Sequence, residues 1–194
     1  GDFITKSGGY QNAYTNYDTT TYHLSVDPSH IDRALSLFGQ QFSVPLLSQE
    51  YVSKEKKVIH AEFQYRKDSV FRKTLSVAKN AFFGKGQNIS KFSTGNSDSL
   101  SALDDKTLTQ RMRSWWEQNY SADGMAIVIY GPQSIKELQS LAEKNFAPIS
   151  KRPNQKSYPL NEVIAKTPSI AKARINDEER SLYLLFKLPQ KDPE

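Results

Sequence analysis

Two short runs that favour β-strands, joined by a polar turn, constrain the fold of this chain most strongly. The first run follows Gly8 and ends at Thr15, and the second covers residues 19–26. Because the turn 16–18 between them is short and polar, the pair predicts a β-hairpin. Asn12 and Thr15 place hydrogen-bonding side chains where a covered strand would carry apolar ones. The first run is therefore predicted to be an edge strand that meets a partner.

Helical patterns dominate the region that follows. Asp27-Pro28 predicts a helix start, with Asp27 as the N-cap and Pro28 in the first turn. Apolar residues then recur at helical spacing up to Phe42. A longer helical pattern covers residues 48–83 without proline or glycine, and a break near Asp68-Ser69 would divide it in two. Two more helices are predicted to begin after Asp104 or Asp105 and after Ser134.

The arrangement of strands and helices predicts an α+β fold. Residues 125–130 form a continuous apolar run next to Gly131, which predicts a buried central strand. The predicted order β-β-α-α-α-β-α keeps strands and helices in separate blocks. The composition changes after residue 150. We therefore expect one domain over residues 1–150, and over residues 151–194 a linker with the first strands of a following domain, at 164–175 and 181–188.

Composition excludes several classes of protein. The 194 residues contain no cysteine, which excludes disulfides, thiolate nucleophiles and cysteine-based zinc sites. The net charge is +5, but basic residues alternate with acidic ones, as in Lys54-Glu55-Lys56-Lys57. Such alternation is typical of solvated helix faces, so we expect no nucleic-acid partner. No apolar run reaches the length that spans a membrane.

The three histidines do not form a recognisable site by themselves. His23, His30 and His60 are never four residues apart, the spacing that places two imidazoles on one helix face. Each is interpreted as a surface or hydrogen-bonded side chain. No nucleophile-elbow motif supports a Ser-His-Asp triad.

Glu55 and Glu62 form the most informative acidic pair. Seven residues are nearly two helical turns, so both carboxylates lie on the same side of the predicted helix, with Val58 and Ile59 between them. A carboxylate on an apolar stripe needs a counter-charge or a bound cation. Arg66, four residues after Glu62, could form an ion pair, and a metal ion is the alternative.

A series of motifs in a fixed order resembles the N-terminal domain of the insulinase (pitrilysin) family of zinc metallopeptidases. The resemblance covers residues 8 to about 150 and continues weakly near 182–189. Each motif is weak alone, and their order and spacing carry the resemblance. The motifs are Gly8-Gly9-x-x-Asn12-Ala13-Tyr14-Thr15, Thr20-x-Tyr22, Phe42-x-x-Pro45-Leu46, Glu55-x6-Glu62 and Lys91-Phe92-x-x-Gly95-Asn96, followed by Leu100, Tyr120, Met125 and Gly131.

The resemblance implies a mainly antiparallel sheet with helices packed on one face, and a zinc-dependent endopeptidase. In such enzymes two histidines and a catalytic glutamate belong to an H-x-x-E-H helix. Glu62 matches the third zinc ligand, and Glu55 matches a carboxylate that supports the site without binding the metal. The strand around Asn12 and Ala13 matches the edge to which a substrate peptide adds.

The H-x-x-E-H motif is absent from the 194 residues, and in the family it precedes the Asn12–Ala13 strand. The chain is therefore interpreted as a fragment whose general base lies upstream of Gly1. Alone it is expected to bind Zn²⁺ poorly and to be proteolytically inactive. Its expected partners are a peptide or protein substrate and the remaining domains of the same polypeptide. The alternative is a non-catalytic relative that acts as a peptide-binding or assembly module. The compartment stays open, and a periplasmic or secreted parent is compatible with the sequence.

Overall fold

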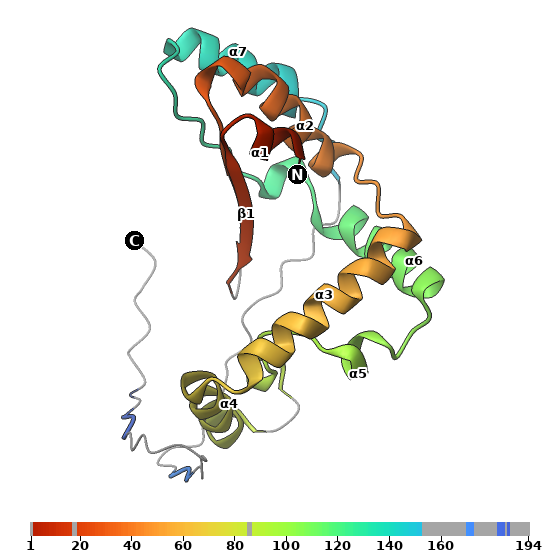
Figure 1. Cartoon of the computed structure of the whole chain (residues 1–194), viewed down its shortest axis with the longest axis vertical. Coiled ribbons are helices and arrows are strands. Elements are labelled where there is room, and N and C mark those ends of the chain that lie inside the picture. Colours follow the sequence, from red (N-terminus) through yellow and green to blue (C-terminus); the bar gives the residue numbers. More distant parts are fainter. Residues whose placement is uncertain are drawn as a thin grey trace. The chain divides into compact units, whose positions relative to one another are not determined.

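The computed structural model describes residues 2–16, 19–84, 87–152, 170–172, 182–184 and 186. These residues belong to two compact units. Unit 1 contains the described residues up to Lys57 and from Asp98 to Arg152, and unit 2 contains those from Val58 to Ser97 and from Ile170 onward. Figure 1 shows the elements of both units in chain order.

The predicted hairpin is present in unit 1. After the short helix α1 (Asp2–Lys6), strands β1 (Tyr10–Thr15) and β2 (Thr20–Ser25) pair antiparallel, with Ala13 opposite Tyr22. This two-stranded sheet is the only one that the described residues form. The expected mainly antiparallel sheet is therefore wrong for this part of the chain, in which most residues are helical.

Helices α2 and α7 carry the core of unit 1. The 3₁₀ turn η1 (Pro28–His30) leads into α2 (Ile31–Ser43), and α7 (Ile135–Phe146) lies beside α2 (Figure 1). Leu35, Phe146 and Ile149 form the buried centre, with Phe38 among the side chains packed around it. Helix α6 (Asp105–Asn119) and the 3₁₀ turn η3 (Ala122–Gly124) also belong to this unit.

The start signals read from the sequence are confirmed. Asp27 accepts a hydrogen bond from the Ser29 N–H, and Asp104, rather than Asp105, caps α6. Ser134 and Glu137 form a reciprocal capping box at α7. These contacts are local, so the sequence pattern alone predicts them.

The prediction of a buried central strand over residues 125–130 is wrong for the described structure. Met125 and Ile129 pack against the core of unit 1. Val128 and Tyr130, however, are 92% and 97% exposed, and the segment has no regular secondary structure. A strand requires a neighbour for its backbone groups, and no described strand pairs with this segment.

The long helical pattern divides at the expected place. Helix α3 (Gln49–Lys67) and helix α4 (Val70–Phe83) are separated by Asp68 and Ser69, and the Ser69 hydroxyl caps α4. Helix α3 begins in unit 1 and ends in unit 2. Between α4 and α6 the chain forms the 3₁₀ turn η2 (Asn88–Ser90) and the short helix α5 (Ser97–Leu100).

The strands expected at 164–175 and 181–188, and with them the expected domain over 151–194, lie almost entirely outside the described residues. Among the described helices, none combines the length and the apolar character needed to cross a membrane.

Candidate functional site

The outer edge of β1 offers backbone groups to a partner. The Asn16 N–H donates to the Thr19 carbonyl (2.8 Å), which makes this pair a hydrogen-bonded one. Because hydrogen-bonded and non-hydrogen-bonded pairs alternate along an antiparallel ladder, the N–H and C=O of Ala13 point away from β2. The Asn12 side chain accepts a hydrogen bond from this outward Ala13 N–H (Oδ1···N 2.8 Å). The predicted edge strand is thus present, and its outward Ala13 N–H is already hydrogen-bonded to the side chain of the preceding residue, Asn12.

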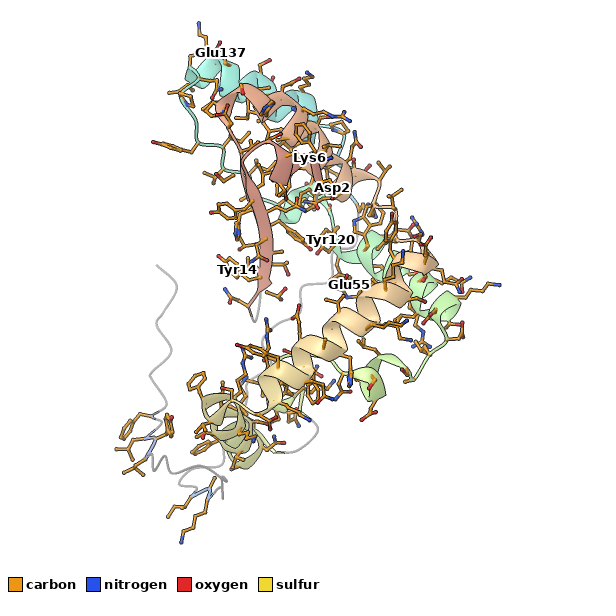
Figure 2. All side chains as sticks on the ribbon, in the orientation of Figure 1. Asp2, Lys6, Tyr14, Glu55, Tyr120 and Glu137 are labelled. Carbon is orange, nitrogen blue, oxygen red and sulfur yellow. The ribbon has the colours of Figure 1, made fainter. Side chains whose placement is uncertain are left out.

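The two faces of the hairpin differ in character. On one face, the rings of Tyr10 and Tyr14 both contact His23, at centroid distances of 5.9 and 6.2 Å, and the two tyrosines are more than half exposed. Figure 2 labels Tyr14 on β1. On the other face, the Tyr22 ring packs edge-to-face on Phe42 (5.0 Å). The hairpin therefore presents an open aromatic face and an inner face that packs on α2.

The inner face borders an apolar cavity of about 450 Å³ in unit 1. Tyr22 and Tyr120 join their hydroxyls by a hydrogen bond there, and burial raises the pKa of Tyr120 above its ordinary value. The cavity is lined in part by α6. Its lining includes Phe42, Leu108, Met112, Trp115 and Trp116.

The N-terminal half of α3 is attached to α6. Asp105, the first residue of α6, accepts hydrogen bonds from Lys56 Nζ (2.8 Å) and from the Ser53 hydroxyl. The hydrogen bond from Lys56, followed by that from Ser53, holds the pKa of Asp105 below its usual value. This contact fixes the stretch of α3 that carries Glu55.

Glu55 and Glu62 both lie on α3, as predicted, and Figure 2 labels Glu55 there. Both side chains are exposed, and Val58 between them is itself 49% exposed. Since water solvates these carboxylates, the expected cost of placing them on an apolar stripe does not arise. Glu62 pairs with Arg66 (Oε2···Nη2 3.4 Å), so the ion pair weighed from the sequence is present.

Both ring nitrogens of His60 contact neighbouring polar groups. Its Nδ1 lies 3.1 Å from both the backbone N and the hydroxyl of Ser97, and its Nε2 lies 3.1 Å from the Gln64 amide nitrogen. Because the Ser97 N–H donates to Nδ1, this nitrogen carries no proton and no free lone pair for a metal. The sequence did not predict this contact, and its only signal was the motif 91–96 just before Ser97.

The carboxylate oxygens of Glu62 are donors that zinc accepts. Within the described residues, however, no group of three or more histidine, aspartate or glutamate side chains is placed to hold one ion. Glu62 therefore fits a zinc site as one ligand, and the described chain does not provide the complete site. Asn12, Ala13 and Glu55 belong to unit 1 and Glu62 to unit 2.

Comparison with known proteins assigns the sequence to a family. Residues 2–88 match the sequence model described as "Insulinase (Peptidase family M16)", and residues 108–194 match that described as "Peptidase M16 inactive domain". The chain belongs to the insulinase family. The first insulinase match contains the hairpin and all of α3, and therefore Asn12, Ala13, Glu55 and Glu62.

Named relatives are peptidases of this family. The chain is 34% identical over 151 residues to "Insulin-degrading enzyme-like 1, peroxisomal" of Arabidopsis thaliana, a match that covers 76% of this chain and 15% of that protein. It is 25% identical over 192 residues to "Protease 3" of Escherichia coli K12, covering 98% of this chain and 19% of that protein.

The crystal structure of pitrilysin shows the same fold, with a TM-score of 0.72 at 24% identity over 80% of this chain and 16% of the pitrilysin chain. The chain thus spans less than a fifth of the length of these three proteins.

Proposed function

We propose that this chain contributes the substrate edge and one metal ligand to a zinc endopeptidase of the insulinase type. The observation that carries the proposal is the outer edge of β1, which pairs with no other described strand and where the backbone groups of Ala13 point away from β2. Membership of a peptidase family supports the same conclusion. Zinc bound by Glu62 together with an H-x-x-E-H histidine pair would supply an activated water for peptide hydrolysis.

The edge strand would bind an extended peptide as an additional strand. Main-chain hydrogen bonds to the outward groups of Gln11, Ala13 and Thr15 select an extended backbone rather than one side chain. The Asn12 amide must release the Ala13 N–H when the peptide arrives, because this N–H donates to Asn12 in the free chain. Asn12 and Ala13 thus act together at the centre of the edge.

The edge can be tested by NMR with a synthetic peptide rich in threonine and valine. We expect the peptide to shift the amide signals of Gln11, Ala13 and Thr15 more than those of Tyr10 and Tyr14. A peptide N-methylated on its bonding edge should bind at least tenfold more weakly. Ala13→Pro removes an outward N–H without breaking the ladder, so the hairpin should persist while peptide binding is lost. Uniform shifts along β1, or unchanged binding by Ala13→Pro, would contradict this role.

The metal ligand can be tested by supplying the missing histidines. A synthetic helical peptide bearing H-x-x-E-H is mixed with the chain, and Zn²⁺ affinity is measured by calorimetry. Glu62→Gln should lower the affinity of the mixture to that of the peptide alone, and Glu55→Gln should lower it less. Glu117→Gln, which changes an exposed carboxylate on α6, is the matched control.

The alternative function is a peptide-binding or assembly module without catalysis. It predicts the same shifts at the β1 edge but no dependence of Zn²⁺ affinity on Glu62. The two measurements together therefore separate the functions.

A further inference from the structure

A short segment packs along one side of α3 in unit 2. We call residues 92–97 the clamp segment. The Phe92 ring meets Phe63 edge-to-face at 5.4 Å, and Ser97 donates to His60 through its backbone N–H at 3.1 Å. His60 and Phe63 are three residues apart, so they are neighbours on one side of the helix. The clamp segment contains most of the motif 91–96, whose contacts are not evident from the sequence.

Arg66 lies three residues after Phe63, and therefore on the same side of α3. Its Nη1 donates to the Thr94 hydroxyl of the clamp segment (3.4 Å). Its Nη2 pairs with Glu62 Oε2 (3.4 Å). Because the guanidinium is planar and rigid, fixing one nitrogen restricts the direction of the other. One side chain thus connects the clamp segment to Glu62.

The ion pair between Arg66 and Glu62 is partly exposed to solvent. The side chains of Arg66 and Glu62 are 41% and 49% exposed, so the ion pair alone is weak and easily exchanged. A second attachment at Thr94 lowers the conformational freedom that Arg66 must lose to pair with Glu62. The hydroxyl therefore stabilises an ion pair that it does not itself touch.

We propose that Arg66 is a positioning residue for Glu62, held beside the carboxylate by Thr94 of the clamp segment. The inference rests on the proposed function, in which Glu62 is a metal ligand. In the metal-free chain the guanidinium neutralises and orients the carboxylate. A metal ion that binds Glu62 must displace it, and Thr94 keeps the displaced guanidinium attached to the clamp segment.

The first test needs no metal and uses the whole 194-residue chain. The carboxyl ¹³C signal of Glu62 is recorded in the wild type, Thr94→Val, Arg66→Gln and the double variant. Thr94→Val should move the signal part of the way toward its position in Arg66→Gln. In the Arg66→Gln background, Thr94→Val should have no further effect. Thr94→Val that leaves the signal unchanged, or moves it equally in both backgrounds, overturns the proposal.

Two control variants exclude a general effect on folding. Arg72 donates to Ser93 of the clamp segment (2.9 Å), and Arg72→Gln should leave the Glu62 signal unchanged. Arg66→Lys keeps the positive charge but lacks the two-pronged geometry. In Arg66→Lys the Glu62 signal should lie closer to its wild-type position than in Arg66→Gln. Adding Thr94→Val to Arg66→Lys should not move the signal further.

The second test adds Co²⁺ and the H-x-x-E-H peptide and follows the visible absorption of the bound metal. Arg66→Gln should tighten Co²⁺ binding about twofold to fivefold, because an opposing ion pair of this strength is removed. Thr94→Val should act in the same direction but less. If the wild type binds no Co²⁺ beyond the peptide alone, the proposed function fails while the ¹³C measurement still decides the role of Arg66. If the wild type binds Co²⁺ and Arg66→Gln does not alter the affinity, only the positioning role fails.

Discussion

At the scale of single residues, Asn12 has two roles that compete. Its side chain satisfies the outward Ala13 N–H in the free chain, and that N–H is also the donor that a substrate strand would require. An unpaired strand edge attracts other chains, and a side-chain cap on the edge donor reduces that tendency. Asn12 therefore protects the edge when no peptide is bound.

Replacing Asn12 by alanine should expose the Ala13 amide. We expect amide hydrogen exchange at Ala13 to become about fivefold faster, the factor that corresponds to one hydrogen bond of about 1 kcal/mol. Exchange is measured by NMR on the free chain. Gln11→Ala, which removes a neighbouring exposed side chain, should leave the Ala13 rate unchanged. Equal exchange in Asn12→Ala and the wild type would show that the cap does not persist in solution.

The carboxylate of Asp105 should make the attachment of α3 to α6 sensitive to acid. Its folded-state pKa is lowered, so it contributes stability above the ordinary aspartate value of about 3.9 and loses this contribution as the pH falls through the folded value. Asp105→Asn should therefore lower the urea midpoint at pH 7, and the difference from the wild type should shrink at pH 3. Asp98→Asn, on an exposed acid of α5, serves as the control. A difference that is equal at both pH values would exclude an ionic contribution.

At the scale of elements, the close approach of α2 and α7 depends on one glycine. Gly39 is buried in α2, and a methyl group added there would lie 2.3 Å from the Asn145 carbonyl oxygen of α7. Gly39→Ala should destabilise the chain by about 1–3 kcal/mol because of this overlap, even though alanine favours the helix by up to about 1 kcal/mol. Urea unfolding measures the change. Gln40→Ala, at the next and exposed position, should be neutral or stabilising. A stabilised Gly39→Ala would mean that the two helices separate easily.

The elements also show which features the sequence could predict. The caps at Asp104 and Ser134 use side chains within three residues of the backbone they bind, so local patterns predicted them. The prediction of a strand over 125–130 was wrong because an apolar run does not by itself provide a neighbouring strand for its backbone groups. The contact between Arg66 and Thr94 joins residues 28 positions apart, and no periodicity reports such a contact. The hydrogen bond from Ser97 to His60 was missed for the same reason.

At the scale of the whole molecule, the family match indicates a peptidase, whereas the described side chains supply only part of a zinc site. The insulinase match over residues 2–88 includes Asn12, Ala13, Glu55 and Glu62. The described residues nevertheless provide one exposed carboxylate and a strand edge rather than a complete ligand set. A single carboxylate binds zinc far more weakly than three ligands, so the two proposed contributions become useful only when histidine ligands are added.

The purified 194-residue chain is therefore expected to show no zinc-dependent cleavage of a fluorogenic peptide, whether or not Zn²⁺ is added. The physical reason is that the 194 residues lack the H-x-x-E-H motif whose histidines would complete the proposed zinc site, and one carboxylate does not hold a zinc ion that activates water at neutral pH. Activity that disappears with a chelator and persists in Glu62→Gln would come from a contaminating protease. Activity that disappears both with a chelator and in Glu62→Gln would overturn this expectation, since it would require the chain to assemble a working metal site by itself. In that case the remaining ligands would have to come from this chain or from a second copy, and the dependence of activity on protein concentration would distinguish the two.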